Sequence, residues 1–337
     1  MTAPAMPSSP FVPRISPFAA EAEREVRAHL RRCGLLRSPE AARYYDTSRL
    51  GRLTAQIYPD ALPERLMLIA QWFCVWTMFD DQLEMLPDVR PAAAVDLVAE
   101  RMISWLDSRR PRTGADGPFA TGFGEAWAGM RACSSAGWQR RFLAHTRQYL
   151  AGCRWEADNR SAATVPDLES YVFRRRRFGG IRAAMDLSEF GGGYELPGWV
   201  HGAAPVQELL DVLGDIALWG NDVFSVHVDR EEGNVSNLVF VLQRQHACDL
   251  AEAVVAASAM LDERLARLRA LEDELADWCV FQHLHPRRCA ELARFVEGLH
   301  TWISGNIAWS AANSRYVTAR GRTGGSQPNF LLALLPG

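Results

Sequence analysis

The sequence contains no lysine, so every cationic side chain apart from histidine is an arginine. Its seven cysteines are scattered and include no C-x-x-C pair, which favours reduced thiols and a cytoplasmic protein. The sequence has no run of eighteen apolar residues, which argues against a membrane span. Residues 1–18 lack the basic-then-apolar order of a secretory signal, and we interpret residues 1–20 as a flexible N-terminal arm.

Strand patterns and a strong net charge are also nearly absent. The formal net charge of −3 offers no global attraction to nucleic acid or to an anionic membrane, so we expect neither a nucleic-acid partner nor a stable membrane anchor. Apolar residues instead recur at three and four places between short Gly/Pro breaks, which indicates successive amphipathic helices. This pattern predicts an all-α protein with helices near 21–33, 62–86, 92–108, 136–158, 167–177, 181–191, 205–230, 235–244, 248–274 and 287–316.

One helical domain accounts for this organisation. The best internal linker covers residues 107–123, but it is short and the helical pattern is the same on both sides. No repeat of 20–50 residues is evident. We therefore assign residues 21–316 to a single domain and residues 317–337 to a C-terminal tail. The tail begins polar and glycine-rich and ends apolar, so either it is a flexible cap or its last apolar residues pack back onto the domain.

The first candidate site is a group of carboxylates. The run QWFCVWTMFDDQLE places Asp80, Asp81 and Glu84 at the C-terminal end of an apolar and aromatic helix. Asp80 and Glu84 are four residues apart and share a face. Mg²⁺ prefers oxygen ligands and usually keeps water or phosphate as well, so these carboxylates can hold it beside a diphosphate. The alternative is that they solvate the helix end, although acids there face the unfavourable end of the helix dipole.

A second polar stripe lies in the run LWGNDVFSVHVDREEGN. Asn221, Ser225 and Asp229 fall at positions i, i+4 and i+8 of a helix whose other positions are largely apolar. Their oxygens suit a second hard cation, and the alternative is a solvent-facing ridge. Two acidic clusters that face each other in a helical bundle are costly unless cations neutralise them. Together, therefore, the two stripes indicate a metal site more strongly than either does alone.

Arginines provide candidate donors for a phosphate group. The run Arg174 to Arg177 ends a helix before a glycine pair, and Arg315 and Tyr316 end the last helix. The planar fork of an arginine suits phosphate oxygens. A solvated helix face and contact with RNA are the alternatives for the four consecutive arginines.

These motifs resemble those of bacterial class I terpene synthases. FDDQLE is similar to the aspartate-rich DDxxD/E motif of that family, NDVFSVHVD is similar to its N-D-x-x-S-x-x-x-E motif, and the terminal RY pair follows in the same order. The resemblance spans roughly residues 20–320. It implies a single-domain α-helical bundle of the class I terpenoid synthase type with a central active-site cavity.

The resemblance also implies roles for the arginines and the glycine break. Arg175 stands at the interval before Asn221 at which the family carries its diphosphate-sensing arginine. Phe178 and Gly179 fall on the linker and effector positions that follow; glycine fits the small effector position, whereas phenylalanine is unusual at the linker position. The pair Arg315 and Tyr316 would contact the diphosphate.

Two positions depart from the family pattern. Asp229 replaces the usual glutamate, and Val228 stands where a diphosphate-binding lysine or arginine is common. Arg230 is expected to point elsewhere on the helix. These departures imply weakened or altered metal affinity rather than loss of activity.

The implied chemistry is ionisation of a prenyl diphosphate and cyclisation of the resulting carbocation. Three Mg²⁺ ions would be held by Asp80, Asp81 and Glu84 on one wall and by Asn221, Ser225 and Asp229 on the other. Aromatic side chains would line the cavity and stabilise positive charge without capturing it. Farnesyl diphosphate is the expected substrate, followed by geranylgeranyl and geranyl diphosphate. A homodimer and closure of the tail over the site are further expectations. The aromatic candidates are Phe73, Trp76, Phe79 and Trp309.

Three other functions compete with a cyclase. A chain-elongating prenyl diphosphate synthase normally carries a second DDxxD motif and lysines for a homoallylic diphosphate, whereas this sequence has NDVFS and no lysine. A non-catalytic helical protein that binds a prenyl diphosphate would fit the two departures at Val228 and Asp229. RNA binding through Arg174 to Arg177 predicts salt-sensitive affinity, which the acidic balance elsewhere disfavours.

Overall fold

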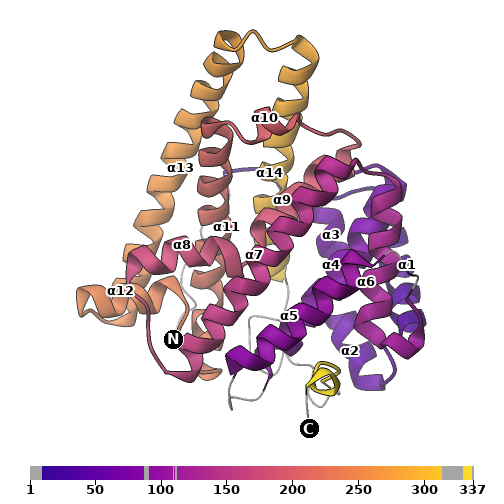
Figure 1. Ribbon diagram of the computed structural model, residues 1–337. Coiled ribbons are helices and arrows are strands. Elements are labelled where there is room, and N and C mark those ends of the chain that lie inside the picture. Colours follow the sequence, from indigo (N-terminus) through magenta and orange to yellow (C-terminus); the bar gives the residue numbers. More distant parts are fainter. Residues whose placement is uncertain (1–9, 87–90, 109, 111, 313–328, 336–337) are drawn as a thin grey trace.

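A computed structural model describes residues 10–86, 91–108, 110, 112–312 and 329–335. Within these residues the secondary structure is helical throughout and contains no strand (Figure 1). The α-helices are α1 (Ala19–Cys33), α2 (Pro39–Ser48), α3 (Leu50–Ile57), α4 (Pro63–Glu84), α5 (Pro91–Asp107), α6 (Pro118–Ala132), α7 (Ala136–Ser161), α8 (Leu168–Phe178), α9 (Ile181–Gly192), α10 (Gly198–His201), α11 (Ala204–Glu231), α12 (Leu238–His246), α13 (Leu250–Phe281) and α14 (Pro286–Ala312). Two short 3₁₀ turns are η1 (Gly114–Asp116) and η3 (Leu332–Leu334).

Local signals set many of the helix starts. Ser135 and Asp167 cap α7 and α8 with side-chain oxygens, and Asp249 forms a capping box with Glu252 at the start of α13. Proline occupies the first turn of α4 and α6, where its missing N–H costs nothing. All ten predicted helices are present, and most of their ends agree within three residues.

The sequence prediction missed α2, α3, α6 and the short α10, and it was wrong about part of the linker. From Pro118 onward the predicted linker is helix α6, not loop. Glycine lowers helix propensity, and α6 contains three glycines, which interrupt the helical repeat of apolar residues. One of them, Gly122, lies so close to α4 that an added Cβ would be 3.1 Å from the side chain of Val75. Helices α2 and α3 meet at Arg49, whose φ of 49° breaks the helical pattern.

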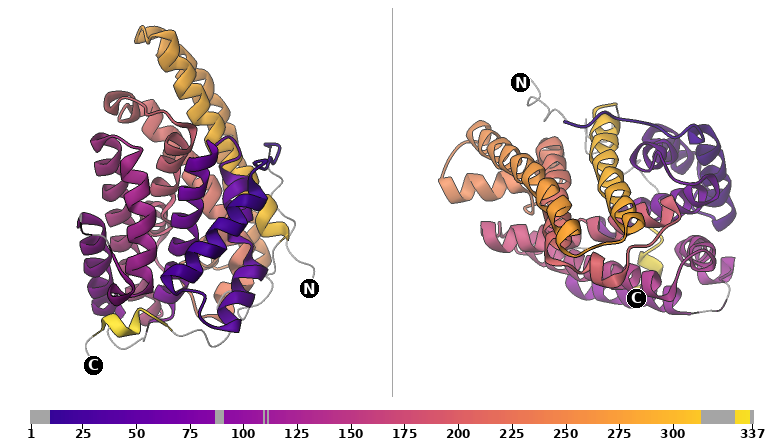
Figure 2. Two further views of the ribbon diagram at one scale, coloured as in Figure 1. Left: turned by 90° about the vertical axis from the view of Figure 1, so that its right-hand side faces the viewer. Right: turned by 90° about the horizontal axis from the view of Figure 1, so that it is seen from above.

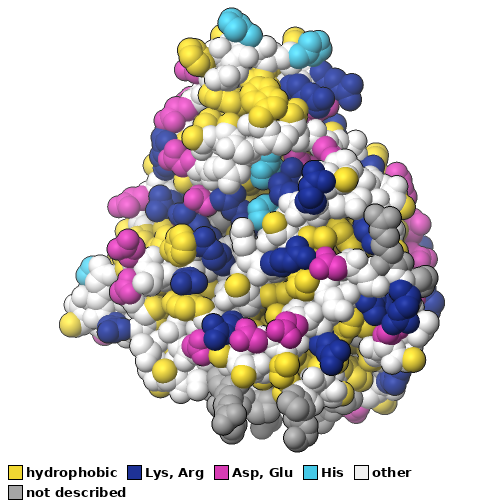
Figure 3. Space-filling view, in the orientation of Figure 1, with side chains coloured by type: hydrophobic (Ala, Val, Ile, Leu, Met, Phe, Trp, Pro, Cys, Tyr) yellow, Lys and Arg dark blue, Asp and Glu magenta, His cyan; other side chains and the backbone are white. Residues whose placement is uncertain are grey.

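The helices surround a central space between an N-terminal and a C-terminal group. Helices α1, α3 and α4 pack together, and α6 packs on α4, while α11 packs on α13 and α14. The long pair α13 and α14 projects beyond the rest of the bundle at the top of Figure 1, and Figure 2 shows the same projection from the side. Basic and acidic side chains are interspersed over the face drawn in Figure 3. No described helix combines the length and the apolar character that a membrane span requires.

An aromatic core determines which face of α4 is turned away from the centre. Trp72 packs against Phe123, Trp127 and Phe142, with ring centroids 4.9 to 6.1 Å apart. Phe79 belongs to this core, because it is fully buried and packs edge-on against the rings of Phe119 and Phe123. Burial of such rings contributes roughly 1.5–3 kcal/mol per side chain. The prediction that Phe79 binds substrate is therefore wrong.

The end of the C-terminal tail packs back onto the bundle. The backbone N–H of Phe330 donates to the side-chain oxygen of Gln82 at 2.8 Å, and the side chain of Asn329 donates to its carbonyl at 2.9 Å. Leu331 is fully buried. The described end of the tail, residues 329–335, therefore packs on the helical bundle. Arg315, Tyr316 and the rest of 313–328 lie outside the described residues, so their predicted roles stay predictions.

Candidate active site

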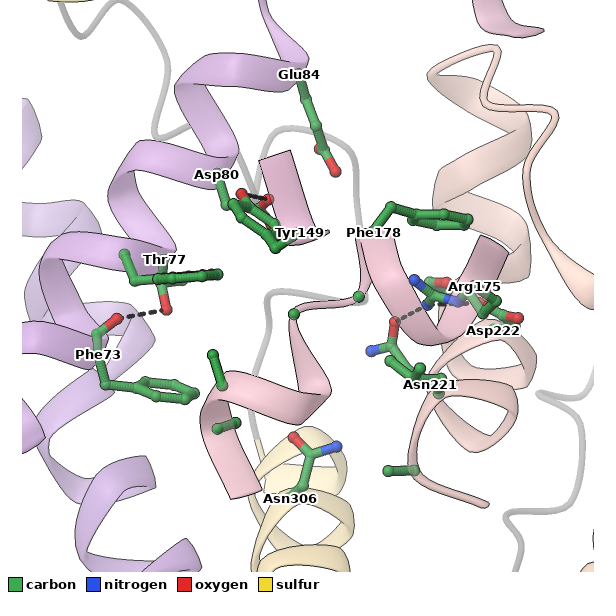
Figure 4. Close-up of a pocket in the computed structure, with 18 of the residues that line it drawn as sticks. Phe73, Thr77, Asp80, Glu84, Tyr149, Arg175, Phe178, Asn221, Asp222 and Asn306 are labelled. Atoms are coloured by element: carbon green, nitrogen blue, oxygen red, sulfur yellow. Dashed lines mark hydrogen bonds and ion pairs between the residues drawn. The ribbon is translucent and has the colours of Figure 1, made fainter. Parts of the chain in front are cut away.

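A cavity of about 200 Å³ opens at the centre of the bundle (Figure 4). Its walls come from helices α3, α4, α7, α8, α9, α11 and α14, which are distant in sequence. The structure brings most of the predicted site residues to this cavity: Phe73, Trp76, Asp80, Glu84, Arg175, Phe178, Gly179, Asn221, Ser225, Asp229 and Trp309 all line it.

Helix α4 contributes two carboxylates to the cavity wall. Asp80 and Glu84 lie one turn apart and both line the cavity, and the hydroxyl of Tyr149 donates to Asp80 at 2.5 Å. Asp81 lies on a different face of α4, where its carboxylate accepts a hydrogen bond from the hydroxyl of Tyr44. It is buried and does not line the cavity. Since consecutive helical residues are 100° apart, only one of two adjacent aspartates can face the cavity. The prediction that Asp81 binds metal is contradicted by this placement.

Helix α11 contributes the second wall. Asn221, Ser225 and Asp229 line the cavity on successive turns. The hydroxyl of Ser225 donates to Asp229 at 2.6 Å, and the side chain of Asn237 donates to the same oxygen at 2.8 Å. Asp229, which replaces the usual glutamate of the family, is only 4% exposed. The two hydrogen bonds therefore hold its shorter carboxylate in one orientation. Asn237 was not predicted, since its position at the start of α12 carries no catalytic motif.

The second departure from the family pattern is Val228, and the nearest cation in sequence is Arg230. Val228 is buried in the bundle, and Arg230 is exposed and does not line the cavity. The expectation that Arg230 points elsewhere on the helix is confirmed. Neither residue offers a cation to the cavity.

A buried ion pair joins α8 to the α11 wall. The guanidinium of Arg175 donates to Asp222 at 2.7 Å and to the side-chain oxygen of Asn221 at 3.2 Å. Asp222 also accepts from the hydroxyl of Tyr171 and from the backbone N–H of Leu238. Burial raises the pKa of Asp222 to about 6, against the opposing effects of Arg175 and Tyr171. Asp222 is thus the counter-ion of Arg175.

The four consecutive arginines have different surroundings. Arg176 donates to Asp211 and Asp215 at 2.7 to 2.8 Å. Arg177 lies 3.6 Å over the ring of Phe173. Among the four, only Arg175 combines burial with a place on the cavity wall. The run is therefore not one continuous basic surface, which weakens the alternative of RNA contact.

Glu156 is a cavity residue that sequence reasoning did not assign. It lies on α7, on the cavity wall that also holds Asp80 and Glu84. Burial and then the negative charge of Glu84 raise its pKa to about 8, although Arg175 and Arg160 oppose the shift. The run WEADNR contains this glutamate, but without a partner in sequence the run does not indicate a role. The mouth of the cavity thus collects carboxylates whose repulsion a cation would relieve.

The glycine break between α8 and α9 lies at the cavity wall. Gly179 is the C-cap residue after α8, and Gly180 is the N-cap residue before α9, with φ of 64°, in the left-handed region that favours glycine. An added Cβ on Gly180 would be 2.9 Å from the indole of Trp76. Trp76 in turn packs on Tyr149, with ring centroids 4.3 Å apart. The break therefore brings backbone close to the aromatic wall.

Helix α14 supplies the rest of the aromatic lining. The indole N–H of Trp309 donates to the carbonyl of Ser48 at 2.9 Å, and that of Trp302 donates to the hydroxyl of Tyr58 at 3.3 Å. Asn306 lies between these two tryptophans on the same face. Trp302 and Asn306 were not predicted, although Trp302, Asn306 and Trp309 follow one another at intervals of four and three residues, which places all three on one helix face.

The oxygen donors on the cavity wall suit a hard cation that also binds water or phosphate. Within the described part of the chain, no three His, Cys, Asp or Glu side chains come close enough to bind one ion. Oxygen donors instead stand on two opposed walls, with Asp80 and Glu84 on α4 and Asn221, Ser225 and Asp229 on α11. Such a split set fits Mg²⁺, which is usually bound by one or two carboxylates together with phosphate or water.

Comparison with known proteins identifies the family. Residues 71–267 match the family described as terpene synthase family 2, C-terminal metal binding. Because this match spans more than half of the chain, the protein belongs to that family and is a class I terpene synthase, an enzyme of the lyase class.

Named relatives and solved structures agree with this assignment. The chain is 32% identical to pristinol synthase of Streptomyces pristinaespiralis over 311 residues, which cover 91% of this chain and 83% of that protein. It is 29% identical to a (−)-beta-caryophyllene synthase of Saccharothrix espanaensis, with coverage of 96% and 91%. In fold it is similar to germacradien-4-ol synthase from Streptomyces citricolor, with a TM-score of 0.79, 24% identity and coverage of 93% and 100%.

Proposed function

We propose that this terpene synthase ionises farnesyl diphosphate with Mg²⁺ and cyclises the resulting carbocation to a sesquiterpene. The observation that carries the proposal is the pair of oxygen-donor walls, α4 and α11, that face each other across one end of an aromatic cavity. The caryophyllene synthase of Saccharothrix espanaensis is described as farnesyl diphosphate cyclizing, which supports the same substrate here. Geranylgeranyl diphosphate is the second candidate.

Three Mg²⁺ ions are proposed at the cavity mouth, held by Asp80 and Glu84 on one wall and by Asn221, Ser225 and Asp229 on the other. When bound, the ions would neutralise the negative charge that develops on the departing diphosphate. The bonds from Ser225 and Asn237 hold the Asp229 carboxylate in a fixed orientation at the cavity wall. This support offsets the shorter reach of aspartate.

Arg175 is proposed to bind the diphosphate. Its guanidinium is already at the cavity wall and held by Asp222, and its Nε has no hydrogen-bond partner within the described residues. A donor that is preorganised in a buried site stabilises developing charge without first reordering. Arg315 and Tyr316 are proposed as further donors, brought over the site by closure of the tail.

The aromatic half of the cavity is proposed to fold the hydrocarbon chain and shield the cation from bulk water. Phe73, Trp76 and Trp309 present ring faces that stabilise positive charge without forming a bond to it. Phe178 and Gly179 lie on the cavity wall next to Arg175, where the end of α8 would contact the reacting part of the chain. A homodimer is proposed as the oligomeric state.

The test is incubation of the purified protein with geranyl, farnesyl and geranylgeranyl diphosphate, each with Mg²⁺ or with EDTA. Released diphosphate and hexane-extractable products are measured, the latter by gas chromatography and mass spectrometry. We expect cyclic C15 products from farnesyl diphosphate only when Mg²⁺ is present. Cyclic C20 products from geranylgeranyl diphosphate instead would overturn the substrate assignment, and absence of Mg²⁺-dependent diphosphate release from all three would overturn the proposed function.

A further inference from the structure

An amide stands among aromatic rings at the far end of the cavity. Asn306 extends from α14 into the cavity at the end opposite Glu84 (Figure 4), between Trp302 and Trp309 on the same helix face. It is half-buried. Helix α9 packs against α14, and its cavity residues Ala183, Ala184 and Leu187 are all apolar. An amide is therefore an exception in this part of the wall.

The neighbouring polar groups already have partners, whereas the amide of Asn306 does not. The indole N–H groups of Trp302 and Trp309 donate to Tyr58 and Ser48, respectively. The hydroxyl of Thr77 donates to the carbonyl of Phe73 at 3.0 Å. Within the described residues the side chain of Asn306 makes no hydrogen bond. Because this half-buried amide faces the cavity, its oxygen and N–H groups are available to a polar molecule that binds there.

A hydrocarbon chain cannot satisfy that amide. The isoprenoid part of a prenyl diphosphate has no hydrogen-bonding atom, and its diphosphate end belongs at the opposite mouth, near Asp80 and Glu84. Water is the polar molecule small enough to share the cavity with the chain. The side-chain oxygen of Asn306 can accept a hydrogen bond from water and leave an oxygen lone pair free, whereas an indole N–H can only donate.

We propose that Asn306 holds a water molecule that captures the final carbocation, so that the main product is a terpene alcohol. The inference rests on the proposed function. The water oxygen donates a lone pair to the cationic carbon and forms the new C–O bond. The oxonium that results then loses a proton to a second water molecule, and that proton finally neutralises one negative charge of the released diphosphate, so the net reaction consumes one water and yields one alcohol and one protonated diphosphate. Asn306 is a positioning residue and exchanges no proton.

The test follows the origin of oxygen in the products. Wild-type protein is incubated with farnesyl diphosphate and Mg²⁺ in H₂¹⁸O, and the extract is examined by gas chromatography and mass spectrometry. We expect an alcohol that carries ¹⁸O. A wild-type extract that contains only hydrocarbon, or an alcohol without ¹⁸O, overturns the inference whether or not any variant folds.

Two matched variants test the role of the amide itself. Asn306→Leu is expected to lower the ratio of alcohol to hydrocarbon by about tenfold, the effect of losing one hydrogen bond to the attacking water. Diphosphate release should stay within about threefold of wild type, since the ionisation site is untouched. Thr77→Val removes a side-chain hydroxyl that lines the same cavity but already donates to Phe73, and it should leave the product ratio within about twofold.

The outcomes separate this inference from the function it rests on. An unchanged product ratio in Asn306→Leu, or a larger loss of alcohol in Thr77→Val, overturns the role of Asn306 while Mg²⁺-dependent diphosphate release still supports a cyclase. Absence of that release from wild-type protein with all three prenyl diphosphates overturns both.

Discussion

Asp80 and Asp81 are adjacent in sequence but belong to different environments. Asp80 lines the cavity and accepts a hydrogen bond from Tyr149, and Asp81 is buried against α2, where Tyr44 donates to it. The aromatic core formed by Trp72 and Phe79 fixes the rotation of α4 and so decides which aspartate faces the cavity. The two residues therefore make a matched pair for testing the metal site.

Asp80→Asn is expected to lower kcat/KM for Mg²⁺-dependent diphosphate release by about 10²–10³-fold, because it removes a charge from the cation site. Asp81→Asn should change kcat/KM by less than about tenfold, because an amide oxygen still accepts from Tyr44. Steady-state assays of released diphosphate at several Mg²⁺ concentrations measure both. Equal losses in the two variants would show that Asp81 enters the site during catalysis.

The break between α8 and α9 depends on a conformation that only glycine adopts cheaply. Gly180 has φ of 64° and lies against Trp76 and Tyr149, which form part of the cavity wall. Gly220, on α11, has helical surroundings and open space where a Cβ would be added. The same substitution at these two positions should therefore have opposite effects.

Gly180→Ala is expected to destabilise the protein by about 1–3 kcal/mol, because it combines a left-handed backbone with a close contact to Trp76. Gly220→Ala should stabilise it by about 0.5–1 kcal/mol, since alanine loses less entropy in a helix. Denaturant unfolding followed by circular dichroism measures both changes. A neutral Gly180→Ala variant would mean that the break relaxes without cost.

The terminal segment 329–335 connects to the helix that carries the first motif. Asn329 and Phe330 bond to Gln82, which lies between Asp81 and Glu84 on α4, and Leu331 is fully buried. The ring of Phe330 also meets that of Phe119 on α6. The segment thus covers apolar surface beside the end of α4 that carries Asp80 and Glu84.

Ending the chain after residue 328 is expected to lower the free energy of unfolding by about 2–5 kcal/mol, because it exposes the surface that Leu331 and Phe330 cover. Thermal and urea unfolding measure the loss. Leu332→Ala, at a half-exposed position of the same segment, serves as the control and should cost less than about 1 kcal/mol. A truncated chain as stable as the full chain would show that the segment contributes no packing energy.

Ligand binding is expected to stabilise the whole molecule against unfolding, because the two oxygen-donor walls, on α4 and α11, belong to the N-terminal and the C-terminal group of helices. Mg²⁺ together with inorganic diphosphate would bridge α4 and α11, and a ligand that binds only the folded state raises stability by about 2.7 kcal/mol at a hundredfold excess over Kd. Differential scanning fluorimetry should show a higher Tm with both ligands than with either alone.

Chelation provides the control for that stabilisation. EDTA should return the Tm to its unliganded value, and the Asp80→Asn variant should show a much smaller shift. A shift of equal size with diphosphate alone would indicate binding to arginines without a metal, and would count against the proposed cation site.

The sequence by itself determined the helical class, the order of ten helices and the two polar stripes. These features are local: apolar residues repeat with the period of a helix, and ligands four residues apart share a face whatever packs around them. The motif resemblance then indicated the family, which the match over residues 71–267 confirmed.

Only the tertiary structure decided which side chains meet. The rotation of α4 turns Asp81 and Phe79 away from the cavity. The packing of α7 and α14 adds Glu156 and Asn306 to the cavity wall. Asn237, at the start of α12, donates a hydrogen bond to Asp229. Each of these outcomes depends on contacts between helices far apart in the chain, where packing of large aromatic side chains sets rotation and depth. The local periodicity of a sequence does not determine contacts between distant helices, so the roles of these residues could be found only in the folded molecule.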